Sequence, residues 1–445
     1  MRSHLRKHWL TLGSLLLSLV LTLVIGGVVA PALSTTPAPV DSVRSRITEI
    51  EQTWRNEYNT YFNTSFTSPA LTADAINATL ARLSRQTGQK LALIYAFPQP
   101  DALELVLVIP GQAPVQKRLT DVPLETLRPV INGFRTRVAS PVRTRLYLEP
   151  GRQLYQWLIS PLEADLQAQG VDTLVFCVGE NLRSLPFAAL HDGQQFLIEK
   201  YSVGLIPAFN LTNLNYNRLR QLRVLAMGAS EFQNLENLPA VPLELSAITQ
   251  NLWRGRVFLN QQFTLANLRR QLTSQAFGIV HLATHAEFRP GEPDNSYIQL
   301  WQGDRLNLDQ LRRLDWRDLP VELLVLSACQ TALGDEEAEL GFAGLSFQSG
   351  VKSSLASLWR VSDTGTLALM REFYWQLANP EVATKAEALR RTQIAMLKGQ
   401  IYIENNQLHS SGEVLLLPDE LSQSGRFTFA EPYFWGAFTL VGSPW

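Results

Sequence analysis

The chain has 445 residues, 46% of them hydrophobic, and a formal net charge of −1. This length allows one large core or two smaller ones, and the near-neutral charge gives no basic field that would favour a nucleic-acid partner. The two cysteines, Cys177 and Cys329, are too few for a disulfide framework or a paired-cysteine metal site. We therefore expect no metal ion and no cofactor.

Residues 1–33 are expected to form a membrane anchor or a signal peptide. Three basic residues precede the uncharged stretch Trp9–Ala30, which is long enough to span a bilayer. The basic flank would stay in the cytoplasm, so the rest of the chain would lie on the non-cytoplasmic side. Small residues at Ala30–Ala32 also suit a cleavage site, and both alternatives stay open. Either one predicts a membrane-anchored or exported protein.

A Pro-rich linker at residues 34–40 leads into a helical segment at residues 41–88. Over Asp41–Phe62 the apolar residues recur every three or four positions, which predicts an amphipathic helix. These residues are Val43, Ile47, Ile50, Trp54, Tyr58 and Tyr61. The helix either lies on its own domain or forms a stalk that would make a homo-oligomer. A second helix is expected at Ala73–Arg85.

From residue 89 onward, strands and helices alternate, which predicts an α/β fold with a mostly parallel sheet and helices on both faces. The expected strands are Leu91–Phe97, Leu103–Ile109, Thr173–Val178, Arg223–Gly228, Phe277–Phe288, Val321–Thr331, Ser353–Trp359 and Phe434–Gly442. The expected helices are Pro242–Leu252, Leu265–Leu272, Leu308–Leu314, Glu337–Ser349, Thr364–Leu377 and Lys385–Leu397. A capping box at Ser160–Glu163 predicts one more helix, and Leu408–Arg426 is expected to be a polar surface excursion.

The strongest functional signal is a histidine and a cysteine late in two buried-strand patterns. His285 follows the apolar run that begins at Phe277, and Cys329 follows the run that begins at Val321. In open α/β sheets, chemistry collects at the carboxyl ends of such strands. A thiol with a pKa of about 8.5 needs a neighbouring base or a positive field to become a nucleophilic thiolate. An imidazole can fill that role and then protonate a leaving amine.

Three separated motifs resemble the CHAT domain, a caspase-like family. They are HLATHAEF (281–288), LLVLSACQTALGD (323–335) and GFAGLSFQSGVKSSLASLWRVSD (341–363). The resemblance extends over residues 89–445, with an N-terminal part at 89–215 and a catalytic part at 216–445. It implies the fold shared by caspases, metacaspases and separases, and a catalytic dyad of His285 and Cys329. It also implies a cysteine endopeptidase that acts on a protein or peptide. The alternative is a weak or inactive scaffold for protein interaction or signalling.

The backbone N–H groups of Ala286 and Cys329 are the candidate oxyanion donors. The family usually has Gly at the first of these positions. Ala286 keeps the N–H group but narrows the available backbone angles, which favours the scaffold alternative slightly.

Three charged residues are candidates for the substrate pocket. Asp363 would either cap a helix that starts at Thr364 or select a basic side chain before the scissile bond. Arg360 would select an acidic one. Glu337 lies in an acidic run that is either a solvated helix start or a substrate-facing loop. His281 and Cys177, inside strand patterns, are expected to be core residues.

Overall fold

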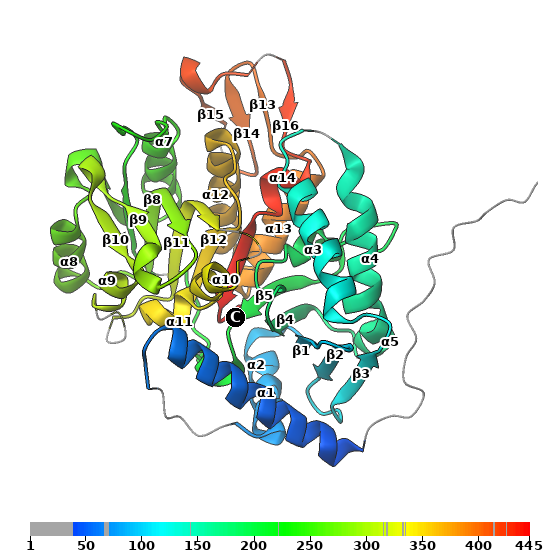
Figure 1. The fold of residues 1–445 in the computed structure, drawn as a ribbon. Helices are drawn as coiled ribbons and strands as arrows, with labels where there is room; N and C mark the ends of the chain where they lie inside the picture. The colour runs from blue at the N-terminus through cyan, green and yellow to red at the C-terminus, as the bar shows by residue number, and fades with distance from the viewer. Residues whose placement is uncertain are drawn as a thin grey trace, which may run out of the picture. The chain divides into compact units, whose positions relative to one another are not determined.

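The computed structural model describes residues 39–445, except 66–70, 143, 221, 315, 317, 318, 332, 334, 413 and 424 (Figure 1). At residues 251, 328–331 and 348 it describes the backbone alone. The expected anchor or signal at residues 1–33 and most of the linker lie outside the described residues. Within these ranges, no helix combines the length and hydropathy needed to cross a bilayer.

One large sheet organises the chain. Its strands follow the order β10-β9-β8-β11-β12-β17-β5-β4-β1-β2-β3, and β6 and β7 join it through β8. The strands are β1 Leu91–Pro98, β2 Leu103–Val108, β3 Val115–Leu119, β4 Thr173–Val178, β5 Ser202–Ile206, β6 Val224–Gly228, β7 Gly255–Leu259, β8 Ile279–Phe288, β9 Tyr297–Gln299, β10 Arg305–Asn307, β11 Leu323–Thr331, β12 Ser353–Ser357 and β17 Phe438–Gly442.

The expectation of a mostly parallel sheet is confirmed. Strands β7, β6, β8, β11 and β12 are parallel to one another, as are β17, β5, β4 and β1. The antiparallel pairs are the meander β1-β2-β3, the extension β8-β9-β10, and the junction of β12 with β17. Five strands of this sheet were not predicted, namely β3, β5, β7, β9 and β10, which are three to five residues long.

Helices cover both faces of the sheet (Figure 1). They are α1 Val40–Tyr61, α2 Ala73–Thr87, α3 Leu124–Val138, α4 Leu148–Leu158, α5 Ser160–Ala168, α6 Leu197–Lys200, α7 Val241–Ser246, α8 Leu265–Ser274, α9 Leu308–Arg312, α10 Glu336–Ala343, α11 Leu345–Ser349, α12 Asp363–Ala378, α13 Lys385–Leu397 and α14 Pro432–Trp435. Strand β1 shows the alternation that makes two cores. Leu93 and Tyr95 join the cluster with α1 and α2, while Ile94 joins the cluster with α3 and α4.

Of the two alternatives for Asp41–Phe62, the helix that lies on its own domain is confirmed, and the dimerising stalk finds no support. The apolar stripe of α1 is buried against the same chain, where the Trp54 ring stacks on Tyr95 at 5.9 Å between ring centroids. Buried Glu51 accepts a hydrogen bond from the Tyr95 hydroxyl at 2.8 Å and another from the backbone N–H of Phe209 at 2.9 Å. Helix α1 is therefore part of the domain core, because its apolar surface is already covered.

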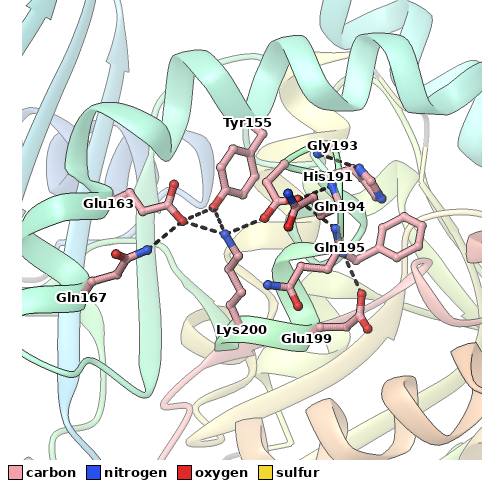
Figure 2. Close-up of polar contacts among 11 residues, drawn as sticks. Tyr155, Glu163, Gln167, His191, Gly193, Gln194, Gln195, Glu199 and Lys200 are labelled. Carbon is pink, nitrogen blue, oxygen red and sulfur yellow. Dashed lines mark hydrogen bonds and ion pairs between the residues drawn. The ribbon is translucent and has the colours of Figure 1, made fainter.

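The helix predicted from Ser160 is confirmed as α5, but the capping box at Ser160–Glu163 is wrong. Helix α4 runs almost directly into α5, and Ile159 between them keeps right-handed helical angles, so Ser160 lies inside a helix. Glu163 instead accepts hydrogen bonds from the Tyr155 hydroxyl at 2.8 Å and from Lys200 Nζ at 2.7 Å (Figure 2). Lys200 also pairs with Asp192 at 2.6 Å. One ammonium group thus cross-links α4, α5, α6 and the loop that begins at Asp192.

A second, small sheet borders the expected surface excursion at Leu408–Arg426 and includes only a few of its residues. Its order is β15-β14-β13-β16, with β13 Tyr402–Glu404, β14 Gln407–His409, β15 Leu415–Leu416 and β16 Phe427–Thr428. Asn405 and Asn406 connect β13 to β14 with φ of 53° and 57°, as a type I′ turn requires. The signal was in the sequence, since paired asparagines tolerate these angles.

Candidate active site

Strands β8 and β11 bring His285 and Cys329 to the same part of the sheet. The two strands are adjacent and parallel, with Ala328 opposite His285 and Cys329 opposite Ala286. The register shifts just before this point, where two residues of β8 oppose Ser327 alone. Such bulges re-aim side chains and are common beside active sites. The expected adjacency of the two strands is confirmed. For Cys329 the structure describes only the backbone, so the position of its thiol is not given.

The orientation of the His285 ring is set by a backbone carbonyl in the loop after β6. Its Nε2 lies 2.8 Å from the carbonyl oxygen of Glu236. A carbonyl oxygen only accepts hydrogen bonds, so Nε2 carries the proton and Nδ1 is left with the lone pair. The contact therefore selects the tautomer whose free nitrogen is a base. Sequence reasoning missed Glu236, because any residue type can supply a backbone carbonyl.

The surroundings of His285 favour its neutral form. The Phe232 ring lies against the imidazole, with 4.8 Å between centroids. Burial lowers the pKa of His285 below its usual 6.5, and the positive charge of Arg360 acts in the same direction. A neutral imidazole can accept a proton, which is the first requirement for a general base.

Arg360 and Asp363 both bind the loop that orients His285. Arg360 Nη2 pairs with Glu236 Oε2 at 2.6 Å, and Asp363 Oδ2 accepts a hydrogen bond from the backbone N–H of Ala240 at 2.5 Å. The interpretation of Asp363 as a helix cap is wrong by one residue. Ser362, in extended backbone conformation, caps α12 by accepting from Gly365 N–H at 3.1 Å. The roles of Arg360 and Asp363 as substrate-pocket residues stay predictions.

Asp363 should make the stability of the protein depend on pH. Burial raises the pKa of Asp363 from 3.8 to about 7, and the negative charges of Glu244 and Glu236 add to the rise. A raised carboxyl pKa stabilises the folded state at low pH, and this contribution is lost as pH rises through 7. Asp363→Asn keeps an acceptor for the Ala240 N–H. Relative to this variant, the free energy of unfolding of the wild type should fall by about 2–3 kcal/mol between pH 5 and 8. Urea unfolding of both proteins at both pH values measures this change. The same stability difference between the two proteins at pH 5 and pH 8 would contradict the prediction.

The acidic run after Cys329 begins helix α10 and ties it to other parts of the domain. Asp335 caps the helix by accepting from Ala338 N–H at 2.9 Å. Exposed Glu337 accepts from the backbone N–H of Gly291 at 2.6 Å. Glu339, only 1% exposed, pairs with Arg135 at 2.7 Å, so the run is only partly a solvated helix start. The pocket role of Glu337 stays a prediction.

His281 is a core histidine, as predicted. It is fully buried, with Nε2 2.7 Å from Glu244 Oε1 and Nδ1 3.1 Å from the Tyr374 hydroxyl. These contacts join β8 to α7 and α12 behind the candidate site. Within the described ranges, no three His, Cys, Asp or Glu side chains gather closely enough to hold a metal ion.

Cys177 is also a core residue, as predicted. It lies within β4, is fully buried, and burial raises the pKa of its thiol well above the ordinary value. We expect Cys177→Ala to lower the free energy of unfolding by about 1 kcal/mol, because it removes one small buried group. Labelling of the remaining thiol should be unchanged. Chemical denaturation and thiol labelling of the two proteins measure these effects, and a loss of labelling contradicts the assignment.

Comparison with solved structures supports the fold. The Saccharomyces cerevisiae separase in its complex with securin aligns with a TM-score of 0.50 and 10% identity, covering 91% of this chain and 34% of the separase chain. The chain thus spans about a third of the length of that separase. The RgpB pro- and mature-domain complex of Porphyromonas gingivalis aligns with a TM-score of 0.40 and 10% identity, covering 72% of this chain and 76% of that one.

Comparison by sequence assigns the family. No curated protein matches the chain. The family model of the CHAT domain matches residues 148–443, which include α4, both candidate strands and all of β17. The predicted resemblance is therefore confirmed over about two thirds of the chain, and the separase likeness shows a caspase-like arrangement of the sheet and helices. This chain belongs to the CHAT domain family.

Proposed function

We propose that the protein is a caspase-like cysteine endopeptidase that uses His285 and Cys329. His285 lies on β8, directly beside strand β11, which carries Cys329. The observation that carries the proposal is the hydrogen bond from His285 Nε2–H to the Glu236 carbonyl. It leaves Nδ1 as the only ring nitrogen that can take a proton from a neighbouring thiol. The substrate would be a protein or peptide.

The proposed reaction proceeds in two stages. Cys329 gives its proton to His285 Nδ1, and the thiolate attacks the scissile carbonyl carbon. Backbone N–H groups of Ala286 and Cys329 would stabilise the developing oxyanion. His285 then protonates the leaving amine, and a thioester remains on Cys329. Water, losing a proton to His285, hydrolyses the thioester and restores the thiol.

The scaffold alternative is favoured by the surroundings of Ala286. This residue lies opposite Cys329 in β11 and opposite Ile298 in β9, so strands flank it on both sides. Sheet pairing that occupied its N–H would remove one of the two proposed oxyanion donors and lower the rate by a factor of about 10²–10³. A slow enzyme and an interaction module differ in whether the thiol reacts.

Active-site labelling tests the proposal. Thiol-reactive peptidyl probes with Arg, Lys, Asp or Asn before the reactive group are incubated with the full-length protein, and the modified residue is identified by mass spectrometry. We expect one of these probes to label Cys329 faster than a simple alkylating reagent of equal reactivity does. Equal rates for all reagents support the scaffold instead. Location on the non-cytoplasmic side, by an anchor or a signal peptide, remains part of the proposal and is tested by fractionation of the tagged chain.

A further inference from the structure

An open groove lies beside His285. It has a volume of about 470 Å³, within the range of roughly 300–1,000 Å³ typical of ligand sites. One wall is the loop after β6, with Phe232 and Leu235, and the other is the β9–β10 connection, with Trp301 and Arg305. Phe232 belongs to the groove and also contacts the His285 ring, at 4.8 Å between centroids. The groove therefore begins where the proposed base stands.

The order of the strands fixes the side on which the groove lies. Strand β8, which carries His285, pairs with β11 on one side and with β9 on the other. The Thr284 hydroxyl donates to the Gln299 carbonyl at 2.8 Å, so the end of β9 is fixed next to the histidine. Cys329 is on β11, whereas the groove lies by β9 and β10. His285 thus stands between the nucleophile's strand and the groove.

This order has a chemical consequence for an extended substrate. In peptide-bond cleavage, the general acid protonates the leaving amine, which belongs to the residue after the scissile bond. The chain on that side must pass the histidine, while the acyl part stays bonded to the cysteine. A groove beyond His285, as seen from Cys329, is therefore positioned for the residues that follow the scissile bond.

The lining of the groove indicates what those residues would be. Phe232, Trp301 and Leu235 supply apolar surface, and Leu235 is 38% exposed, so a ligand in the groove can reach it. An apolar lining of this kind favours a ligand that buries a large apolar side chain against it.

We propose that this groove binds the residues on the carboxyl side of the scissile bond and prefers a large apolar side chain, aromatic or Leu/Met, among the first of them. This inference rests on the proposed peptidase function. The preference would come from burial of the side chain against Trp301 and Leu235.

The experiment is cleavage-site profiling with a library of peptides derived from a digested proteome. Full-length wild type, Trp301→Ala and Leu235→Ala are compared, with Cys329→Ala as the background. The matched control is Val257→Ala, because Val257 on β7 is 37% exposed, much like Leu235, but lies outside the groove lining. In the wild type and in Val257→Ala we expect large apolar residues to be enriched after the cleaved bond. Trp301→Ala and Leu235→Ala should reduce this enrichment at least threefold while the preference before the bond stays unchanged.

Each outcome decides one question. An enrichment that is absent from the wild type, or that survives in both groove variants, overturns the groove assignment without affecting the peptidase proposal. Cleavage no greater than the Cys329→Ala background overturns the peptidase function. In that case, intact peptides retained on immobilised Cys329→Ala still test the groove. Enrichment of apolar residues among the retained peptides that disappears in Cys329→Ala/Trp301→Ala supports the groove assignment. Retained peptides with no such enrichment overturn it.

Discussion

Replacing Cys329 with Ala is expected to abolish peptide cleavage, lowering kcat/KM by at least about a thousandfold. The substitution removes the only atom in the proposed mechanism that bonds to the substrate carbonyl. His285→Ala should cause a comparable loss while leaving the thiol in place, so that it still reacts slowly with a simple alkylating reagent. The measurement is kcat/KM for the peptide whose residue before the scissile bond labels best as a probe.

The control for this series is Cys177→Ala. Cys177 is fully buried within β4, remote in the sheet order from β11, so its replacement should change kcat/KM by less than about twofold. Equal turnover in wild type and Cys329→Ala would contradict the dyad and favour the scaffold. If turnover persists in His285→Ala but not in Cys329→Ala, Cys329 is still the nucleophile and His285 is not its general base.

Breaking the buried ion pair between Arg135 and Glu339 is expected to have the largest effect on stability. Both side chains are 1% exposed, and their charges are 2.7 Å apart. Arg135→Met removes the guanidinium that pairs with the buried Glu339 carboxylate, which should lower the free energy of unfolding by about 3–5 kcal/mol. Urea unfolding followed by tryptophan fluorescence measures the loss. The double variant Arg135→Met/Glu339→Gln should recover a large part of it, because neither member of the pair then carries a charge.

A surface pair provides the matched control for the buried one. Arg118 and Asp101 are 2.6 Å apart but 39% and 71% exposed. Arg118→Met should cost less than about 1 kcal/mol, because solvent already screens both charges. Equal effects of the two substitutions would contradict the assigned difference in environment.

The Arg135–Glu339 pair also joins the N-terminal half of the domain to the half that carries His285 and Cys329. Arg135 lies on α3, and Glu339 lies on α10, the first helix after Cys329. The Ser184 hydroxyl donates to the same carboxylate at 2.5 Å. Helix α1 reaches this region too, since Glu57 pairs with buried Arg183. The segment that follows Cys329 is thus held by residues about 150 to 200 positions earlier in the chain.

The amino-acid sequence by itself determined which segments form the central strands and which residues are candidates for chemistry. Continuous runs of apolar residues identify β8 and β11 because a parallel strand is buried on both faces and needs no polar alternation. That pattern, together with the motifs around His285 and Cys329, was sufficient to predict two neighbouring strands and the family. The same reasoning located His281 and Cys177 in the core, since each lies within such a run.

The tertiary structure alone decided how these residues are set against the rest of the chain. The Glu236 carbonyl that orients His285 is a backbone group from a loop 49 residues earlier, and no side-chain pattern marks it. Whether α1 is a stalk or a core helix depended on which surface covers its apolar stripe, and Tyr95 and Phe209 provide that surface. The spacing of apolar residues along a helix indicates that one helix face must be buried. Contacts between segments distant in the sequence determine which surface covers that face.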